Sequence, residues 1–239
     1  MKPYDDPADK GAQVRAMFDN VAHRYDRLNH ILSLGIDRLW RRRLGRIVAR
    51  GRPRAILDLA TGTGDMAIAL ARRIPGAHIT GVDVSGGMLA IGRAKVARAR
   101  LGGRIDLVEG AAEALPLPDN NFDAATAVFG VRNFSDIEKG LGEMHRVLRP
   151  KGMAYVMEFS TPRVRIFSYL YRWYFHRVVP AVGGWISGDR RAYAYLPASV
   201  DEFPAPERFL EMMRRAGFGD CRAKNVFFGV AKIYIGKKQ

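Results

Sequence analysis

Length, composition and charge limit what this chain can be. It has 239 residues, of which 48% are hydrophobic and 26% charged, as in a globular protein rather than a disordered one. The longest nearly unbroken apolar stretch, 178–186, is far shorter than the roughly 20 residues that span a bilayer. The polar N-terminus has no signal-peptide core, and the single cysteine, Cys221, excludes an intramolecular disulfide and a Cys-rich zinc site. We therefore expect a cytoplasmic α/β protein without a metal site.

The net charge points to anionic partners without naming one. Thirty-nine Lys and Arg residues against 24 Asp and Glu residues give +15. Such a surface attracts nucleic acid or the anionic headgroups of a cytoplasmic leaflet. A general preference for arginine on the surfaces of one proteome would also explain it.

The first two thirds of the chain alternate between two periodicities. Residues 12–50 repeat apolar side chains at spacings of three and four, which predicts helix, and Gly35 divides this region into two helices. The expected strands then cover 55–60, 79–82, 105–108, 122–129 and 153–159, and the expected helices cover 67–73, 87–100 and 137–148. Strands that alternate with helices predict a mostly parallel sheet.

The last third has a different pattern. A helix over 206–216, ended by Gly217, precedes a strand over 226–235, which favours an antiparallel hairpin at the sheet edge. We expect a Rossmann-like, seven-stranded sheet with an antiparallel C-terminal edge strand and an N-terminal helical lid. The expected parts are a helical cap (1–50), a cofactor-binding core (51–159), an aromatic and basic insertion over the carboxyl edge of the sheet (160–205), and a C-terminal helix and strand (206–239).

A glycine loop follows the first expected strand, in the sequence DLATGTGD over 58–65. Glycines allow a tight turn and a close approach to a ligand, and the next helix begins with unpaired N–H groups. Asp83 ends the following strand, about 20 residues further on, where a carboxylate can accept both hydroxyls of a ribose. The pair predicts a nucleoside-containing cofactor.

NAD and S-adenosylmethionine are the two cofactors to weigh. The third glycine of the dinucleotide motif is missing, because Ala67 and Ile68 stand in its place. Asp58 suits a cationic sulfonium better than a pyrophosphate, so the loop favours a class I S-adenosylmethionine-dependent methyltransferase. Asp58 as a brace of the loop and Asp83 as a helix cap are the alternatives. The turn EGAAEALP at 109–116 would pack against adenine, unless it is an ordinary strand-to-loop turn.

Three groups of segments resemble one family, the ubiquinone/menaquinone biosynthesis C-methyltransferases, over nearly the whole chain. They are FDNVAHRYDRLN (18–29) with LSLGIDRLWR (32–41), FGVRNF (129–134) with RVLRPKG (146–152) and EFS (158–160), and YAYLPASV (193–200) with MMRRAGF (212–218). The resemblance implies methylation of a ring carbon of a prenylated quinol, and the wording of the motifs is closer to the menaquinone branch. Demethylmenaquinol is therefore the expected acceptor.

The resemblance also places cofactor contacts. It assigns them to Thr63, Asp83 and the turn at 111–112, although Ala111 stands where many relatives have Asn, Val128 where some have Ser, and Phe227 where Thr is common. The full set of expected S-adenosylmethionine contacts is Asp58, Gly62, Thr63, Gly64, Asp83, Val84, Met88, Ala111 and Ala112.

On the acceptor side, the ring carbon becomes nucleophilic when the neighbouring hydroxyl loses its proton. A cation near that oxygen would help, and Arg132 is the candidate, with Asn133 to orient it or the substrate. A structural pairing of Arg132 with Asp136 or Glu158 is the alternative. Tyr25 is expected to close the site together with Asp26 and Asn29, which lie on neighbouring helical faces that also suit packing and capping. The sequence does not choose a base among His23, Tyr193, Tyr195 and water.

Partners follow from the acceptor and the charge. The basic, aromatic segment 164–180 resembles interfacial helices, so we expect peripheral contact with an anionic membrane; a buried helix with snorkelling arginines is the alternative. We expect a homodimer and no nucleic acid, because neither a Pro-Pro-Tyr-type loop nor an added RNA-binding module is present. Another small-molecule methyltransferase and a non-catalytic cofactor-binding protein remain rival interpretations.

Overall fold

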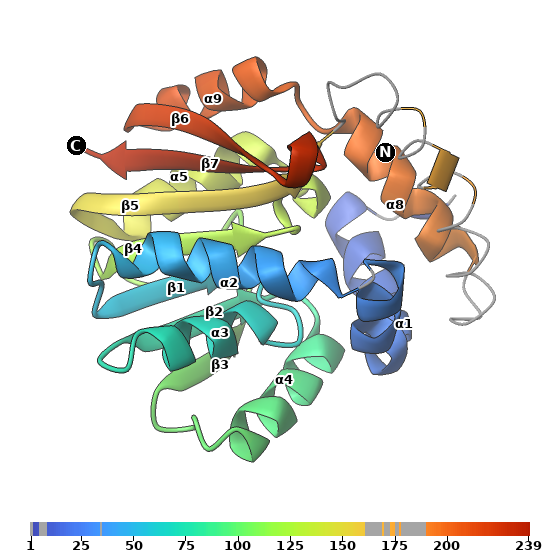
Figure 1. Cartoon of the computed structure of the whole chain (residues 1–239), viewed down its shortest axis with the longest axis horizontal. Coiled ribbons are helices and arrows are strands. Elements are labelled where there is room, and N and C mark those ends of the chain that lie inside the picture. Colours follow the sequence, from blue (N-terminus) through green and yellow to red (C-terminus); the bar gives the residue numbers. More distant parts are fainter. Residues whose placement is uncertain are drawn as a thin grey trace.

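A seven-stranded sheet forms the centre of the residues that this computed structural model describes, which are 2–4, 9–33, 35–160, 169, 173, 174, 177 and 190–239. Its strands are β1 (Ala55–Leu59), β2 (His78–Asp83), β3 (Ile105–Glu109), β4 (Phe122–Val128), β5 (Leu148–Phe159), β6 (Phe218–Val226) and β7 (Ala231–Lys238). They lie in the order β3-β2-β1-β4-β5-β7-β6 (Figure 1). The first five are parallel, and β7 runs antiparallel to both neighbours. The expected fold class is confirmed.

Helices cover both faces of this sheet (Figure 1). They are α1 (Lys10–Leu32), α2 (Ile36–Ala49), α3 (Asp65–Arg73), α4 (Gly86–Arg98), α5 (Ile137–Val147), α8 (Arg190–Glu202) and α9 (Pro206–Arg215), with short 3-10 turns η1 (Val131–Asn133) and η3 (Phe227–Gly229). Helices α2, α3 and α4 pack on one face, and α5 and α9 on the other. Ile56 points to the first face and Leu57 to the second, because successive strand side chains alternate.

The two N-terminal helices separate where the sequence predicts. Gly35 has φ 75, in the left-handed region that glycine adopts without strain. Helix α2 then buries Trp40, Leu44 and Val48 against the sheet, one side chain for each turn. Helix α1 packs with α8 in a separate apolar cluster beyond the carboxyl ends of the strands (Figure 1).

The C-terminal part differs from the expectation. The antiparallel hairpin expected at the sheet edge forms from β6 and β7. The sequence analysis predicted only its second strand, over 226–235, and that strand, β7, lies between β5 and β6 instead of at the edge itself. The true edge strand, β6, is mostly exposed and carries Asp220, Arg222 and Lys224, so it lacks the apolar run of a buried strand.

The aromatic insertion lies mainly outside the described residues. Of the segment 164–180, only residues 169, 173, 174 and 177 are described, and the side chain of Tyr193 falls outside as well. The described helix α8 contacts η1, at the carboxyl edge of β4. Within the described part of the chain, no helix combines the length and the hydropathy that crossing a membrane requires.

Candidate active site

A cavity of about 800 Å³ lies at the carboxyl edge of the sheet, and it is lined by the loops after β1, β2, β3 and β4. The strand order reverses between β1 and β4, and open α/β sheets bind ligands at such a point. Helix α1 and the residues before it form the facing side, from Asp9 to Arg15 with Phe18 and Tyr25. The volume is within the range of cofactor pockets.

Two strand ends in this cavity have strained backbones. Ala60, after β1, has φ 53, and Phe129, after β4, has φ 58, both in the left-handed region that side chains other than glycine rarely adopt. A Cβ on Gly130 would lie 2.4 Å from the Cβ of Ala60, so the two loops approach as closely as a glycine allows. Strain of this kind gathers at ligand sites.

Asp83 faces the cavity with free acceptor capacity. Its Oδ2 accepts the Gly62 N–H at 2.8 Å, and its Oδ1 accepts the Ser85 N–H at 3.0 Å. A carboxylate has about four acceptor positions, so Asp83 keeps acceptor capacity for a ligand. Burial raises the pKa of Asp83, since the ionised form is removed from bulk water. The geometry fits the ribose-binding role that the sequence predicts.

Asp58 lies beneath the glycine loop instead of in the cavity. It is 1% exposed, and its carboxylate accepts the hydroxyls of Thr61 and Thr126, each at 2.7 Å. Burial raises its pKa to about 6. These contacts are those of a brace for the loop, which was the alternative interpretation of this residue.

The cavity gathers most of the other predicted residues. Those that line it are Tyr25, Gly62, Asp83, Val84, Met88, Ala111, Ala112 and Asn133. Four predicted residues do not line it: Asp58, Thr63, Gly64 and Arg132. The first three lie in or below the glycine loop, and Arg132 is the neighbour of Asn133 in the turn η1.

Four groups of polar contacts, which we call the fastenings, hold helix α1 across this cavity. Lys10 Nζ donates to Phe134 O, after β4, at 2.7 Å. Arg15 pairs with Glu109, at the end of β3, at 2.6 Å. Asp19, nearer the middle of the helix, accepts the Ser85 hydroxyl at 2.5 Å and the Gly87 N–H at 3.0 Å, after β2.

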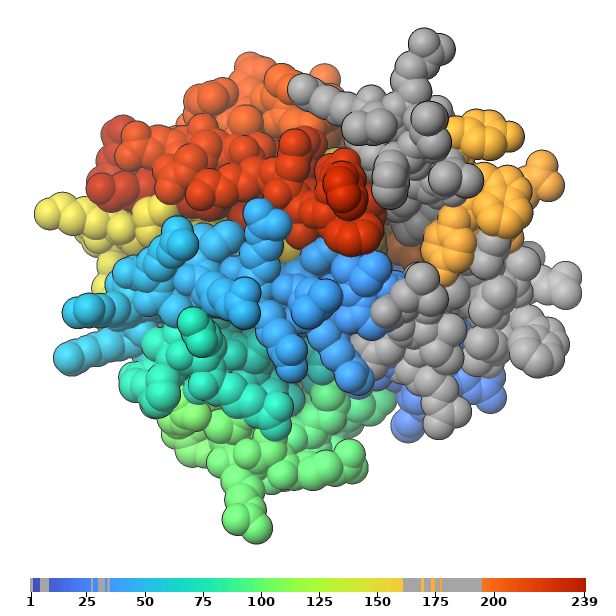
Figure 2. All heavy atoms as spheres, viewed as in Figure 1, coloured from blue at the N-terminus to red at the C-terminus, as the bar shows by residue number. Residues whose placement is uncertain are grey.

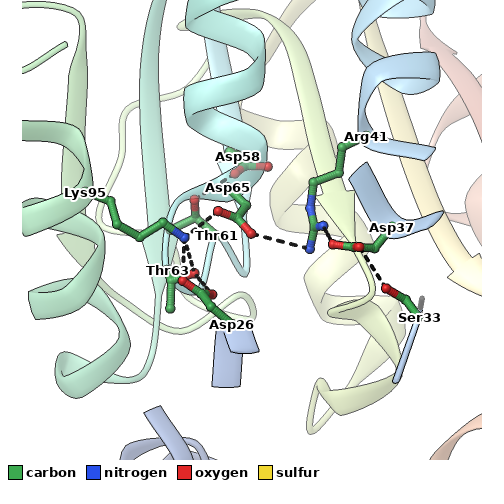
Figure 3. Close-up of polar contacts among 9 residues, drawn as sticks. All are labelled: Asp26, Ser33, Asp37, Arg41, Asp58, Thr61, Thr63, Asp65 and Lys95. Carbon is green, nitrogen blue, oxygen red and sulfur yellow. Dashed lines mark hydrogen bonds and ion pairs between the residues drawn. The ribbon is translucent and has the colours of Figure 1, made fainter. Parts of the chain in front are cut away.

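The fourth fastening joins α1 to the glycine loop (Figure 3). Thr63 Oγ1 donates to Asp26 at 2.6 Å, and Lys95 Nζ, from α4, donates to the other oxygen of Asp26 at 2.6 Å and to Thr63 at 3.0 Å. Lys95 also pairs with Asp65. Arg41 lies 4.0 Å from Asp65, so the network continues into α2. Together, the four fastenings reach the loop after each of β1 to β4.

Arg132 is held by a buried ion pair. Its guanidinium contacts Glu158 Oε2 at 2.9 Å, where the two side chains are 6% and 1% exposed, and it also donates to Phe129 O. This is one of the two pairings that the sequence left open as an alternative. The Arg132 Nε–H and the Tyr195 hydroxyl are buried and have no hydrogen-bond partner among the described residues. Native proteins rarely bury such donors unpaired, so both are candidates to contact a ligand.

The base candidates are narrowed by their surroundings. Burial raises the pKa of Tyr195 to about 12 and also raises the pKa of Tyr25, so both phenols stay protonated near neutral pH. His23 is exposed on α1 and does not line the cavity. Tyr195 therefore suits the role of a donor. The candidates left for the base are a water and Tyr193, whose side chain lies outside the described residues.

The sequence analysis missed the side chains that fasten α1. Lys10, Arg15 and Lys95 were assigned no role, and Asp19 appeared only inside the motif FDNVAHRYDRLN. The contacts that Lys10, Arg15, Asp19 and Lys95 make across the cavity join residues that are at least 66 positions apart, so no local pattern could have revealed the pairs. The one available signal was that Asp19 and Asp26 are seven residues apart, on one face of a helix.

Comparisons with known proteins agree with this geometry. The model of the ubiE/COQ5 methyltransferase family matches residues 7–238. Demethylmenaquinone methyltransferase of Thermus thermophilus is 51% identical over 93% of this chain and 100% of its own length. Ubiquinone/menaquinone biosynthesis C-methyltransferase UbiE of Geobacter sulfurreducens is 48% identical over 96% of this chain and 90% of its own.

A crystal structure shows the same fold at low identity. A SAM-dependent methyltransferase of Thermotoga maritima, described as a possible histamine N-methyltransferase, superposes with a TM-score of 0.65 at 19% identity and covers 95% of this chain and 100% of its own. The enzyme class and the S-adenosylmethionine cofactor expected from the sequence are confirmed, and the chain belongs to the ubiE/COQ5 methyltransferase family.

Proposed function

We propose that this enzyme transfers a methyl group to a ring carbon of a prenylated quinol and that its acceptor is demethylmenaquinol. The Thermus thermophilus relative is named demethylmenaquinone methyltransferase, which supports demethylmenaquinol as the acceptor. The observation that carries the proposal for the site is that Arg132 Nε–H, next in the chain to the cavity-lining Asn133, and the Tyr195 hydroxyl are buried without a hydrogen-bond partner among the described residues. Two donors without partners suit the oxygen of a quinol whose charge grows during the reaction.

S-Adenosylmethionine supplies a methyl group that is already activated on its sulfonium. The protein has to hold the acceptor carbon in line with that methyl group and exclude water. A C–C bond forms as the C–S bond breaks, and the ring carbon then loses its proton. The proton of the neighbouring hydroxyl leaves to water, which makes the ring carbon nucleophilic.

The catalytic roles follow from this requirement. Arg132 stabilises the phenolate through Nε, while Glu158 holds the rest of the guanidinium in place. The Tyr195 hydroxyl donates to the same oxygen. Asn133, in the cavity wall, orients the ring, and Tyr25 closes the cavity from α1. Each of these assignments is part of the proposal.

The predicted cofactor-binding residues fall into two groups, those that would contact S-adenosylmethionine and those that would support the glycine loop. Gly62, Asp83, Val84, Met88, Ala111 and Ala112 line the cavity and are proposed to contact S-adenosylmethionine. Asp58, Thr63 and Gly64 are proposed to support the glycine loop from behind. Because position 111 is an alanine, its contact would be made by the backbone.

A prenyl chain is nearly insoluble in water, so we also infer a cytoplasmic enzyme that touches the anionic inner face of the membrane. Tyr169 and Trp173, of the aromatic segment, are 74% and 56% exposed. Aromatic and basic side chains together are typical of interfacial segments. A homodimer stays a prediction, which sedimentation of the purified protein would test.

The experiment uses methyl-labelled S-adenosylmethionine and a panel of chemically reduced acceptors. Demethylmenaquinol should gain the label, and a benzoquinol is the second acceptor to include, because the name of the Geobacter sulfurreducens relative covers both pathways. Faster methylation of the benzoquinol would reassign the acceptor. Labelling of no quinol, by protein that binds the cofactor, would contradict the proposed function.

A further inference from the structure

The outer face of α2 carries exposed arginine side chains, and no acidic side chain in the described part of the chain pairs with them. Arg38, Arg42 and Arg46 recur every four residues, and Arg43 and Arg50 lie beside them, all exposed. We call these five residues the arginine stripe. The remaining charged residues of α2, Asp37 and Arg41, pair with each other and are largely buried, with side chains 6% and 15% exposed. Among the described residues, no ion pair reaches the stripe.

Helix stability does not explain this arrangement. Like charges four residues apart repel one another, and the stripe contains three such steps, from Arg38 to Arg42, Arg46 and Arg50. Arg38 is also in the first turn, where the positive end of the helix dipole disfavours a cation. An anionic partner along the helix would turn this repulsion into attraction.

Exposed apolar side chains lie at the N-terminal end of the stripe. Leu39 is 59% exposed, Phe227 44% and Phe228 65%. The Phe227 ring lies 6.4 Å from the ring of Trp40, which places η3 beside the first turns of α2. Figure 2 shows the blue surface of α2 bordering the red surface of η3. We call Leu39, Phe227 and Phe228 the apolar tip.

Two of the three residues of the apolar tip have strained backbones. Phe227 has φ 43 and Phe228 has φ 52, and bulky residues in this left-handed region are uncommon. Strain of this kind persists only where the surrounding structure imposes it, and it is concentrated at functional sites. Two aromatic side chains are therefore displayed at a conformational cost.

The tip lies close behind the wall of the cavity. Phe129, which lines the cavity, stacks on Phe159 with ring centroids 4.2 Å apart. Trp40 contacts both rings, at 5.7 Å and 6.1 Å, and then reaches Phe227. The cavity wall and the apolar tip are thus separated by a single layer of packed rings.

We propose that the arginine stripe and the apolar tip dock the enzyme on an anionic bilayer surface, with the tip entering the headgroup region and the stripe on the headgroups. The inference rests on the proposed prenylated acceptor, since such a substrate resides in the bilayer. Apolar insertion combined with arginine is the chemistry of interfacial binding, and each arginine near an anionic surface strengthens it about fivefold. Nucleic acid would use the arginines but leave the tip in water.

The test measures flotation of the full chain with vesicles of phosphatidylcholine alone or mixed with phosphatidylglycerol, at low and high salt. Wild-type protein should bind the mixed vesicles and be released as salt rises. Arg42→Gln with Arg46→Gln should weaken binding about thirtyfold. Leu39→Asn should weaken it several-fold at every salt concentration, because the lost contact is apolar.

Matched controls make the result decisive. Arg98→Gln with Arg214→Gln removes the same charge from exposed positions in the last turns of α4 and α9, and it should leave binding within about threefold of wild type. The stripe variant should unfold at the same temperature as wild type or higher, because it relieves like-charge repulsion. It should also methylate a short-chain acceptor at the wild-type rate without vesicles.

Three outcomes would overturn the proposal. They are equal binding to neutral and anionic vesicles, equal losses in the stripe and control variants, and binding of duplex RNA through the stripe without vesicle binding. A wild-type enzyme that methylates no quinol but still shows stripe-dependent vesicle binding would refute the proposed function alone.

Discussion

The cavity is enclosed by two regions that are held in different ways. The loops after β1 to β4, which we call the pocket wall, are fixed by backbone hydrogen bonds such as Thr61 N to Val82 O at 3.0 Å and Phe129 N to Met157 O at 2.8 Å. Helix α1 is held by side chains, through four polar fastenings and an apolar cluster. The topology of the sheet therefore fixes the position of the pocket wall. Helix α1, which we call the lid, is held mainly by a few charged side chains that can be substituted one at a time.

This difference has a functional consequence. Substitutions of cavity-lining groups in the wall should remove binding or catalysis outright, because those groups face the ligand. Substitutions in the fastenings should change how fast α1 opens, because each removes a contact between α1 and a loop of the wall. The predictions below test this division, from the largest expected effect to the smallest.

Asp83→Ala should cause the largest loss. The carboxylate offers acceptor positions to a ribose and also orders the Gly62 and Ser85 N–H groups. Two lost hydrogen bonds to a charged group correspond to a loss in S-adenosylmethionine affinity of from about a hundredfold to about ten-thousandfold. Calorimetric titration measures it, with Asp106→Ala, an exposed carboxylate on β3, as the control. An affinity within threefold of wild type would remove Asp83 from the site.

Arg132→Lys should lower kcat between about a hundredfold and a thousandfold and leave cofactor affinity unchanged. Lysine keeps a positive charge beside Glu158 but lacks the forked donors of a guanidinium. Alanine is the poorer test, because an unpaired buried Glu158 would cost about 3–5 kcal/mol of stability. Steady-state kinetics with saturating cofactor provide the measurement. A normal kcat would mean that the Arg132–Glu158 pair is only structural.

Asp58→Asn should change the pH dependence of stability. Burial raises the pKa of Asp58 to about 6 in the folded protein, above its ordinary value of 3.8. The folded state therefore binds this proton more tightly than the unfolded state does. The contribution of protonated Asp58 to the free energy of unfolding is present below about pH 4 and is lost as pH rises through about 6. In urea unfolding between pH 4.5 and 6.5, the Asp58→Asn variant should lack this decrease in the free energy of unfolding, which is on the order of 2 kcal/mol. Parallel profiles for the two proteins would contradict it.

Lys95→Met should weaken the attachment of helix α1 to the glycine loop. Without the ammonium, Asp26 and Asp65 face each other unscreened, and α1 loses its fastening to the glycine loop. We expect cofactor release to accelerate about tenfold, measured by stopped flow, with Lys95→Arg restoring most of the difference. Arg15→Gln, which breaks a pair that is 53% and 47% exposed, should change the rate less than threefold. Equal rates for Lys95→Met and wild type would show that this fastening does not gate the cavity.

The sequence predicted the pocket wall better than the lid, for a physical reason. Each loop of the wall is a short run of consecutive residues, so strand, glycine turn and Asp83 can be predicted from local sequence order. The fastenings of α1 join positions such as Asp26 and Lys95, which only the folded chain brings together. Strand β6 was missed because its exposed, charged residues hide the strand pattern, and Asp58 was placed in the site because burial cannot be read from its neighbours.

The central claim is methyl transfer to carbon, and the position of the new methyl group tests it most directly. Demethylmenaquinol should be incubated with the enzyme and S-adenosylmethionine carrying a ¹³C-methyl group, and the product examined by NMR. The account predicts one labelled methyl carbon bonded to the ring. A labelled methoxy carbon would place the methyl group on oxygen and contradict the proposed role of Arg132 as the stabiliser of a carbon nucleophile.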